Sequence, residues 1–308
     1  MITTVTLNVA IDKSYVIEEL KKGEVMRVLK CTKTPGGKGL NVARVIKLCG
    51  EEVLATGFVG GHSGAYVEDL LKEQKIEYDF SHTAFETRTC INVLDREGNS
   101  SEFLEPGEPI TQEELNDFLG KFEKIIDTSN IITISGSVPI GVDTDIYSKL
   151  VTMVKEKGKK VILDTSGELL KEGIKACPTM IKPNRDEVQA LLNISVANWD
   201  ELVNGARKLQ RMGIEIVAVS LGTDGALVIT KDAIYHGKPP RIQPVNTVGS
   251  GDSMVAAFAV GLARGYTIED TLRYAIAVSA ANTLTMTTGS FNEEDMEKLY
   301  DQVSITRQ

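Results

Sequence analysis

The sequence predicts an α/β fold in which helices cover both faces of a mostly parallel β-sheet. Beyond about residue 110, short β-branched runs alternate with segments whose apolar residues recur at helical spacing. Such alternation is typical of parallel strands joined by helices. The composition, 42% hydrophobic and 25% charged, is that of a globular protein with a packed core. No linker or internal repeat divides the 308 residues, so we expect a single domain over 1–308.

The N-terminal third predicts three features. The run 2–9 is rich in β-formers and leads to polar Asp12, which indicates a strand ending in a loop. Apolar residues at helical spacing over 40–49 predict a helix that directly follows a glycine run. Apolar and polar residues alternate over 89–94 and 101–105, which predicts a β-hairpin with one open face.

The rest of the chain predicts the alternating elements. The expected helices span 113–127, 145–157, 185–192, 199–212, 253–264, 268–285 and 293–302, and the expected strands span 131–135, 161–164, 180–182, 216–220 and 226–230.

Charge and cysteine usage exclude several classes of function. A net charge of -9 disfavours nucleic acid or an anionic membrane as the main partner. The four cysteines lie far apart without a CxxC pair, which disfavours a zinc site and fits reduced thiols. There is no apolar run of membrane-spanning length and no signal-peptide pattern. We therefore expect a cytoplasmic protein.

The strongest chemical motif is Gly249-Ser250-Gly251-Asp252 ahead of a small-residue helix. Glycines let backbone N–H groups converge on an anion, and the helix N-terminus adds its positive dipole end. A carboxylate beside such a cradle can take the proton of an attacking hydroxyl. Alternatively, Asp252 is only a first-turn acid that the helix dipole favours.

A second cluster, Gly36-Gly37-Lys38-Gly39-Leu40-Asn41, combines close backbone approach with a charge and an amide, which would suit a sugar phosphate. The alternative is a flexible turn with a solvated lysine. Asp12 could accept hydrogen bonds from two sugar hydroxyls or could be a solvated loop acid.

Two further clusters follow predicted strands. Asn184 and Glu187 match a capping box at a helix start, and they could equally order the waters of a Mg²⁺ ion. The segment Ser220-Leu221-Gly222-Thr223-Asp224-Gly225 could border a nucleotide or simply turn the chain. Arg27 and Arg88 are candidate phosphate clamps. No Walker A loop or dinucleotide fingerprint is present, and the three histidines form no triad pattern.

These clusters, in this order, resemble the ribokinase-like carbohydrate kinases of the phosphofructokinase B family over the whole chain. Both family signatures are matched, by residues 36–43 and 246–257. The segments 6–12, 87–88, 135–139 and 182–184 resemble the branch that contains tagatose-6-phosphate kinase and 1-phosphofructokinase. The resemblance implies a three-layer α/β/α domain with a small β-sheet lid formed by about 13–35 and 86–108. Family lids often pair with a second subunit, so a homodimer is expected.

The resemblance also implies site residues, ATP and Mg²⁺ as cofactors, and a sugar phosphate as substrate. It implies a catalytic centre of Asp252 as general base with Gly249, Ser250 and Gly251 as the anion hole. It implies a sugar-phosphate site of Asp12, Arg27, Gly37, Lys38, Asn41, Arg88 and Ser137. It implies a nucleotide site of Lys182, Asn184, Glu187, Ser220, Gly222, Thr223, Gly225 and Asn282, with Glu187 and Asn184 also serving Mg²⁺.

The expected reaction is phosphorylation of a ketohexose phosphate to the bisphosphate. Residues 90–94 and 286–289 resemble the tagatose-6-phosphate kinases, so the resemblance implies tagatose 6-phosphate ahead of fructose 1-phosphate as the substrate. The alternatives are 1-phosphofructokinase or 6-phosphofructokinase activity, and a non-catalytic sugar- or nucleotide-binding regulator on the same fold. Two departures from the branch, Val9 for proline and Ser250 for alanine, remove neither a charge nor a backbone N–H.

Overall fold

The computed structural model describes residues 1–308 and contains two β-sheets. The main sheet has eleven strands in the order β15-β14-β13-β12-β11-β10-β9-β1-β4-β5, with β6 also paired to β4. Strands β12, β11, β10, β9, β1, β4, β5 and β6 all run parallel to their neighbours in this group. Strands β13, β14 and β15 each run antiparallel to the strand before them. Their bounds are β1 (Ile2–Thr6), β4 (Val53–Gly60), β5 (Glu77–Tyr78), β6 (Ser81–Thr83), β9 (Ile131–Ser135), β10 (Lys160–Asp164), β11 (Met180–Ile181), β12 (Ile216–Ser220), β13 (Ala226–Ile229), β14 (Ile234–Lys238) and β15 (Ser304–Arg307).

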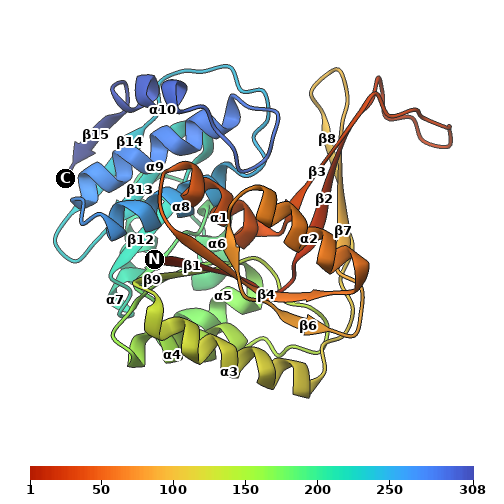
Figure 1. Ribbon diagram of the computed structural model, residues 1–308. Helices are drawn as coiled ribbons and strands as arrows, with labels where there is room; N and C mark the ends of the chain where they lie inside the picture. The colour runs from red at the N-terminus through yellow and green to blue at the C-terminus, as the bar shows by residue number, and fades with distance from the viewer.

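Helices cover both faces of the main sheet, as Figure 1 shows, so the expected three layers are confirmed. One face packs against α1 (Lys38–Leu48), α2 (Gly61–Glu73), α8 (Ser250–Ala263), α9 (Ile268–Thr283) and α10 (Glu293–Tyr300). The other packs against α3 (Gln112–Thr128), α4 (Ile146–Glu156), α5 (Gly167–Gly173), α6 (Arg185–Leu192) and α7 (Trp199–Arg211). The strand period of two explains the two cores, because Ala218 joins the first and its neighbour Val219 the second.

A second, four-stranded sheet, called the small sheet below, projects from the body of the molecule (Figure 1). Its strands lie in the order β3-β2-β7-β8, and only the β2–β7 pair is parallel. Their bounds are β2 (Ala10–Val16), β3 (Lys30–Gly36), β7 (Arg88–Leu94) and β8 (Ser100–Leu104). The expected hairpin is β7 and β8, so that prediction is confirmed.

The expected strand over 2–9 is wrong at its C-terminal end. β1 stops at Thr6, and the chain enters the small sheet at Ala10. Asp12 therefore lies within strand β2, opposite Thr34 and Cys90, rather than in a loop. The apolar pattern hides this break because Leu7 and Val9 stay buried between the two sheets.

Two helices begin earlier than expected, and both starts bear on function. α1 begins at Lys38 instead of residue 40, and α8 begins at Ser250 instead of residue 253. In each case the residue before the helix is a glycine with positive φ, Gly37 at 99° and Gly249 at 81°. The glycine motifs are thus helix starts, and Lys38 and Asp252 lie in first turns.

Several elements carried no sequence prediction: β4 and α2, the short strands β5 and β6, helix α5, strand β14 and the edge strand β15. No helix is long and apolar enough to span a membrane.

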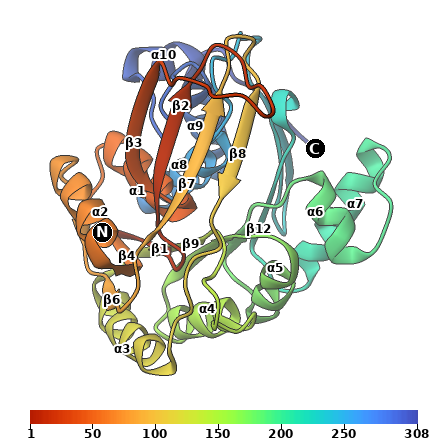
Figure 2. The ribbon, with the colours of Figure 1, turned by 90° about the vertical axis from the view of Figure 1, so that its right-hand side faces the viewer.

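The parallel strands deliver their C-terminal ends to one edge of the main sheet, and the small sheet stands beside that edge (Figure 2). Asp164 and Ser135 are paired at the ends of β10 and β9, and Thr6 ends β1. Ligands of open α/β sheets bind outside these strand ends. The fold therefore places the candidate site between the two sheets and the N-termini of α1 and α8.

Candidate active site

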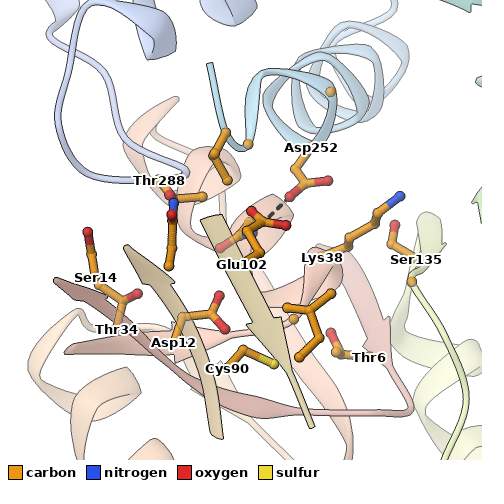
Figure 3. Close-up of a pocket in the computed structure, with 18 of the residues that line it drawn as sticks. Thr6, Asp12, Ser14, Thr34, Lys38, Cys90, Glu102, Ser135, Asp252 and Thr288 are labelled. Atoms are coloured by element: carbon orange, nitrogen blue, oxygen red, sulfur yellow. Dashed lines mark hydrogen bonds between the residues drawn. The ribbon is translucent and has the colours of Figure 1, made fainter. Parts of the chain in front are cut away.

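A cavity of about 590 Å³ lies between the small sheet and the strand ends. Figure 3 shows Asp252 entering it from α8, opposite Asp12 of the small sheet. Ten of the residues expected at the site line this cavity: Asp12, Gly37, Lys38, Asn41, Arg88, Ser137, Lys182, Gly249, Gly251 and Asp252. Segments more than 200 residues apart in the chain thus meet in one place.

Asp252 is a buried carboxylate at the start of α8. Its Oδ2 accepts a hydrogen bond of 2.8 Å from Nδ2 of Asn41. Burial raises the pKa of Asp252 to about 6; Lys38 and Lys182 lower it, and Asp164 adds to the rise. A carboxylate with this pKa is mostly ionised at neutral pH and is a stronger base than an exposed aspartate, as a general base requires.

The first turn of α8 could hold an anion and is called the anion cradle below. The N–H groups of Gly251 and Asp252 have no backbone acceptor, as expected at a helix N-terminus. Gly249 is required at the turn because a Cβ there would approach Thr288 Cγ2 to 2.7 Å at a φ that disfavours side chains. Asn282 lies behind the cradle, where its Nδ2 donates to the Val248 carbonyl at 3.1 Å and its Oδ1 accepts from the Ser290 N–H.

Two lysines and a second buried aspartate lie beside Asp252. Nζ of Lys182 is 3.2 Å from Oδ1 of Asp164, and both side chains are buried. The other oxygen of Asp164, Oδ2, is buried without a hydrogen-bond partner. The charge of Asp164 raises the pKa of Lys38, with further contributions from Asp252 and Glu187. Both lysines are therefore positioned to neutralise a polyanionic ligand.

Polar groups of the small sheet close the opposite side of the cavity. Burial raises the pKa of Asp12, while the Arg44 charge and the Gly37 backbone N–H lower it. Arg88 donates from Nε and Nη2 to the Asn8 carbonyl and from Nη1 to the Glu105 carbonyl. Two of its five N–H groups stay free for an anionic ligand.

Ser137 is held by the same asparagine, since Nδ2 of Asn8 donates to its Oγ at 3.2 Å. Asn8 thus fixes Ser137 and Arg88 relative to each other through its amide and its carbonyl.

The remaining expected residues lie outside the lining of this cavity. Asn184 and Glu187 form the expected capping box of α6, with hydrogen bonds of 2.8 and 2.9 Å. Ser220 forms a β-bridge with Asn184, and Gly222, Thr223 and Gly225 follow it. These residues form a second cluster next to Lys182. Ser250 and Asn282 support the cradle from behind, and Arg27 is exposed in the loop between β2 and β3.

Sequence reasoning missed Asp164, Glu102 and Arg44. Asp164 ends a strand that was expected over 161–164, so the rule that ligands bind at strand ends could have found it. Glu102 stands opposite Asn92 in the hairpin and also lines the cavity, which the strand alternation could have indicated. Arg44 lies within the apolar stripe of α1, and no sequence signal marks it as buried.

Taken together, these groups can transfer a phosphoryl group. A base of raised pKa adjoins a helix N-terminus that can hold an anion, and two lysines supply positive charge. Hydrogen-bonding groups across the cavity can orient a polyhydroxylated acceptor.

Solved structures with this architecture are known. Phosphofructokinase-2 from Escherichia coli, solved in complex with potassium, has a TM-score of 0.91 and 29% identity, with 98% of each chain covered. The same E. coli protein has been solved in complex with fructose-6-phosphate and as a tetrameric inhibited form. A protein from Thermotoga maritima described as a possible 1-phosphofructokinase has a TM-score of 0.92 and 26% identity, over 100% of this chain and 99% of that chain.

A ribokinase from Arabidopsis thaliana, complexed with ribose and ATP, has a TM-score of 0.77 at 22% identity, over 97% of this chain and 98% of that chain, and confirms the ribokinase-like fold. The family model of the pfkB family carbohydrate kinases matches residues 5–295, nearly the whole chain. The chain therefore belongs to the pfkB family of carbohydrate kinases.

Proposed function

We propose that the protein transfers the γ-phosphoryl group of ATP to a primary hydroxyl of a phosphorylated ketohexose, giving a bisphosphate and ADP. The observation that carries this proposal is the position of Asp252. Its buried carboxylate, with a pKa of about 6, adjoins the α8 anion cradle and faces the polar groups of the small sheet. It can therefore reach both a phosphoryl group and an acceptor hydroxyl.

In the proposed reaction the acceptor oxygen attacks the γ-phosphorus while its proton passes to Asp252. The bond from the γ-phosphorus to the bridging oxygen breaks, and its electron pair leaves with ADP. The N–H groups of the cradle and the charges of Lys38 and Lys182 stabilise negative charge on the transferred group. The small sheet limits the access of water, which would otherwise compete as an acceptor.

The sugar phosphate would lie on the side of the small sheet. Asp12, Asn41 and Ser137 offer acceptors and donors to hydroxyl groups. The two free N–H groups of Arg88 match two oxygens of a phosphate. Arg27 is exposed in the 17–29 loop and does not line the cavity, so its place in the phosphate clamp stays a prediction.

ATP would extend from the cradle over Lys182 toward the cluster of Asn184, Ser220, Gly222, Thr223 and Gly225. For Mg²⁺, the capping box uses Oε2 of Glu187 and leaves Oε1 free, and Oδ2 of Asp164 has no partner. These hard oxygen donors suit Mg²⁺, with Asn184 beside them. A bound Mg²⁺ would neutralise part of the charge on the ATP phosphates.

Three ketohexose phosphates are candidate substrates. The segments 90–94 and 286–289 resemble the tagatose-6-phosphate kinases, which makes tagatose 6-phosphate the first candidate. The similarity to proteins described as phosphofructokinase-2 and a possible 1-phosphofructokinase adds fructose 6-phosphate and fructose 1-phosphate.

The test is a coupled ADP-release assay with ATP, Mg²⁺ and each of the three sugar phosphates, with unphosphorylated tagatose and fructose as controls. We expect turnover with at least one sugar phosphate and much less with the free sugars, because Arg88 then has no phosphate to bind. Absence of turnover with every sugar, together with measurable ligand binding, would instead support a regulator that has kept the fold.

We also propose that the protein is a homodimer assembled through the small sheet. Exposed large apolar side chains concentrate on the small sheet and its 17–29 loop, which carry, outside the cavity lining, six of the fifteen in the chain: Leu20, Val25, Met26, Val28, Leu29 and Phe103. A patch of this kind on a projecting sheet indicates a surface that a partner covers. Oligomers related by two-fold symmetry are the commonest solution.

A further inference from the structure

Arg44 is a buried arginine on α1 that does not line the cavity. Its guanidinium donates to Oδ1 of Asn41 at 2.6 Å, to the Pro35 carbonyl at 2.9 Å, and to the carbonyls of Thr288 and Gly289 at 3.2 and 3.4 Å. No carboxylate lies within ion-pair distance of it. Burying a charge that is held mainly by neutral oxygens costs folding free energy. A function of Arg44 in the site would explain why the fold keeps it.

The first of these hydrogen bonds determines how the Asn41 side chain is oriented. Arginine has donors only, so the group that meets Nη2 of Arg44 must be the amide oxygen of Asn41. The amide nitrogen then faces the other way, toward Oδ2 of Asp252 at 2.8 Å. Residues 41 and 44 lie on one face of α1 because they are three positions apart.

Without Arg44, the Asn41 amide could rotate and present its oxygen to Asp252. Two facing acceptors repel unless the carboxyl holds a proton, so this rotation would favour the protonated form of Asp252. Arg44 also ties α1 to the end of β3 and to the 288–289 segment against which Gly249 packs. Arg44 therefore contacts three parts of the site: Asn41 beside Asp252, the end of β3 in the small sheet, and the segment that packs against Gly249.

We propose that Arg44 is a positioning residue: it fixes the Asn41 amide so that Asp252 receives a hydrogen bond and stays ionised and aligned for proton transfer. This inference rests on the proposed role of Asp252 as the base. Burial lowers the pKa of Arg44 to about 10, with Asp12 and Asp252 opposing that shift, so the guanidinium keeps its charge at neutral pH. The charged groups that act on Asp252 are Lys38 and Arg44 of α1, Asp164 at the end of β10, and Lys182 after β11.

The test compares the pH dependence of kcat/KM for the wild type, Arg44→Met and Arg44→Lys, with the sugar phosphate that gives turnover. The wild-type acid limb should lie near pH 6, the pKa of Asp252. Arg44→Met should shift this limb upward by about one pH unit and lower kcat, because the base loses a donor. Arg44→Lys should restore part of the shift, since an ammonium can still donate to Oδ1 of Asn41.

Arg264→Met is the matched control. Arg264 also joins two segments, by donating to the Cys49 carbonyl and to Glu51, but it caps the C-terminal end of α8, whereas Asp252 lies in the first turn of that helix. This variant should lower the melting temperature and leave the pH profile unchanged. If Arg44→Met behaves in the same way, Arg44 has a structural role only and the inference is wrong.

Asn41→Leu keeps the test decisive if Arg44→Met fails to fold. It removes the donor to Asp252 while leaving Arg44 in place, so the acid limb should shift upward as well, and an unchanged limb would overturn the inference. Asp252→Asn separates the two proposals. If Asp252→Asn loses turnover while Arg44→Met and Asn41→Leu keep the wild-type pH profile, the role of Arg44 is rejected and Asp252 remains the proposed base. If Asp252→Asn keeps full turnover, Asp252 is not the base.

Discussion

Ionised Asp252 destabilises the folded protein at neutral pH, where it is proposed to act as a base. Its pKa rises from 3.8 to about 6 on folding, so the folded state binds the proton more tightly than the unfolded state. The penalty is absent below about pH 4, grows as the pH rises from 3.8 to 6, and is complete above 6. A shift of about two pKa units corresponds to about 3 kcal/mol.

We therefore expect Asp252→Asn, a neutral isostere, to raise the free energy of unfolding by about 3 kcal/mol at pH 7.5 and by much less at pH 4.5. Denaturant unfolding at the two pH values measures this. Asp232→Asn is the control, because Asp232 is exposed and away from the cavity. Equal stability of Asp252→Asn and the wild type at pH 7.5 would show that burial does not raise this pKa.

Arg88 should act on binding more than on chemistry. Arg88→Ala removes the two N–H groups proposed to hold the sugar's phosphate and should raise KM for the sugar phosphate by about 10- to 100-fold, with a smaller change in kcat. Arg96→Ala is the control, since Arg96 is an exposed arginine on the same hairpin, paired with Glu18. Steady-state kinetics in which the two variants have the same KM would remove Arg88 from the clamp.

Residue types and spacing predicted Asp252, Lys38 and Asn41 because each is part of a short motif with a local chemical reason. Asp164 was missed although its strand was expected, since a strand-end acid has no motif around it. Arg44 could not be predicted, because an arginine three positions after an asparagine on a helix is usually solvated. The 288–289 segment and the end of β3, which both contact its guanidinium, are distant in sequence or in another element.

The start of α8 combines a sharp turn with the anion cradle. Gly249→Ala would place a Cβ 2.7 Å from Thr288 Cγ2 at a φ of 81°, so we expect a loss in kcat of at least about tenfold together with weaker ATP binding. Gly265→Ala is a matched control, because Gly265 has a φ of 70° but nothing within 4 Å of its Cβ position. Activity assays and calorimetric ATP titration measure both variants. Losses in Gly249→Ala alone indicate that the cradle is displaced, whereas equal losses in both variants indicate backbone strain alone.

The small sheet should hold the dimer. Phe103 of β8 is 57% exposed, and Phe103→Asp would place a charge in the proposed interface. Light scattering at micromolar concentration should show a dimer for the wild type and a monomer for this variant. Phe85→Asp, an exposed phenylalanine outside the small sheet, should leave the mass unchanged. A monomeric wild type, or a dimer that tolerates Phe103→Asp, would contradict the assignment.

At the level of elements, the sequence was informative where the hydrophobic period was clear. The strands and helices from α3 to β13, apart from α5, and the β7–β8 hairpin were expected close to their bounds. The starts of α1 and α8 were placed too late because glycines lower helix propensity. The structure shows that these glycines lie in the turn before each helix and in its first turn. The end of β1 was missed because burial continues through the crossing into the small sheet.

The whole molecule brings the proposed base, the proposed anion cradle and the proposed sugar-binding residues together from distant parts of the chain. Local patterns could predict the three-layer body, but the cavity depends on how the small sheet stands beside the strand ends (Figure 2). That arrangement arises from long-range packing. The position of the small sheet was therefore expected only from the resemblance to a known family.

The most direct test of this account is the rate of phosphoryl transfer by Asp252→Asn, measured by rapid quench with saturating ATP and the best sugar phosphate. The account predicts a loss of roughly 10²–10⁴ in turnover, the usual contribution of a general base, with ATP affinity nearly unchanged. Turnover equal to that of the wild type would contradict it, because the proton would then leave by a route that does not involve Asp252.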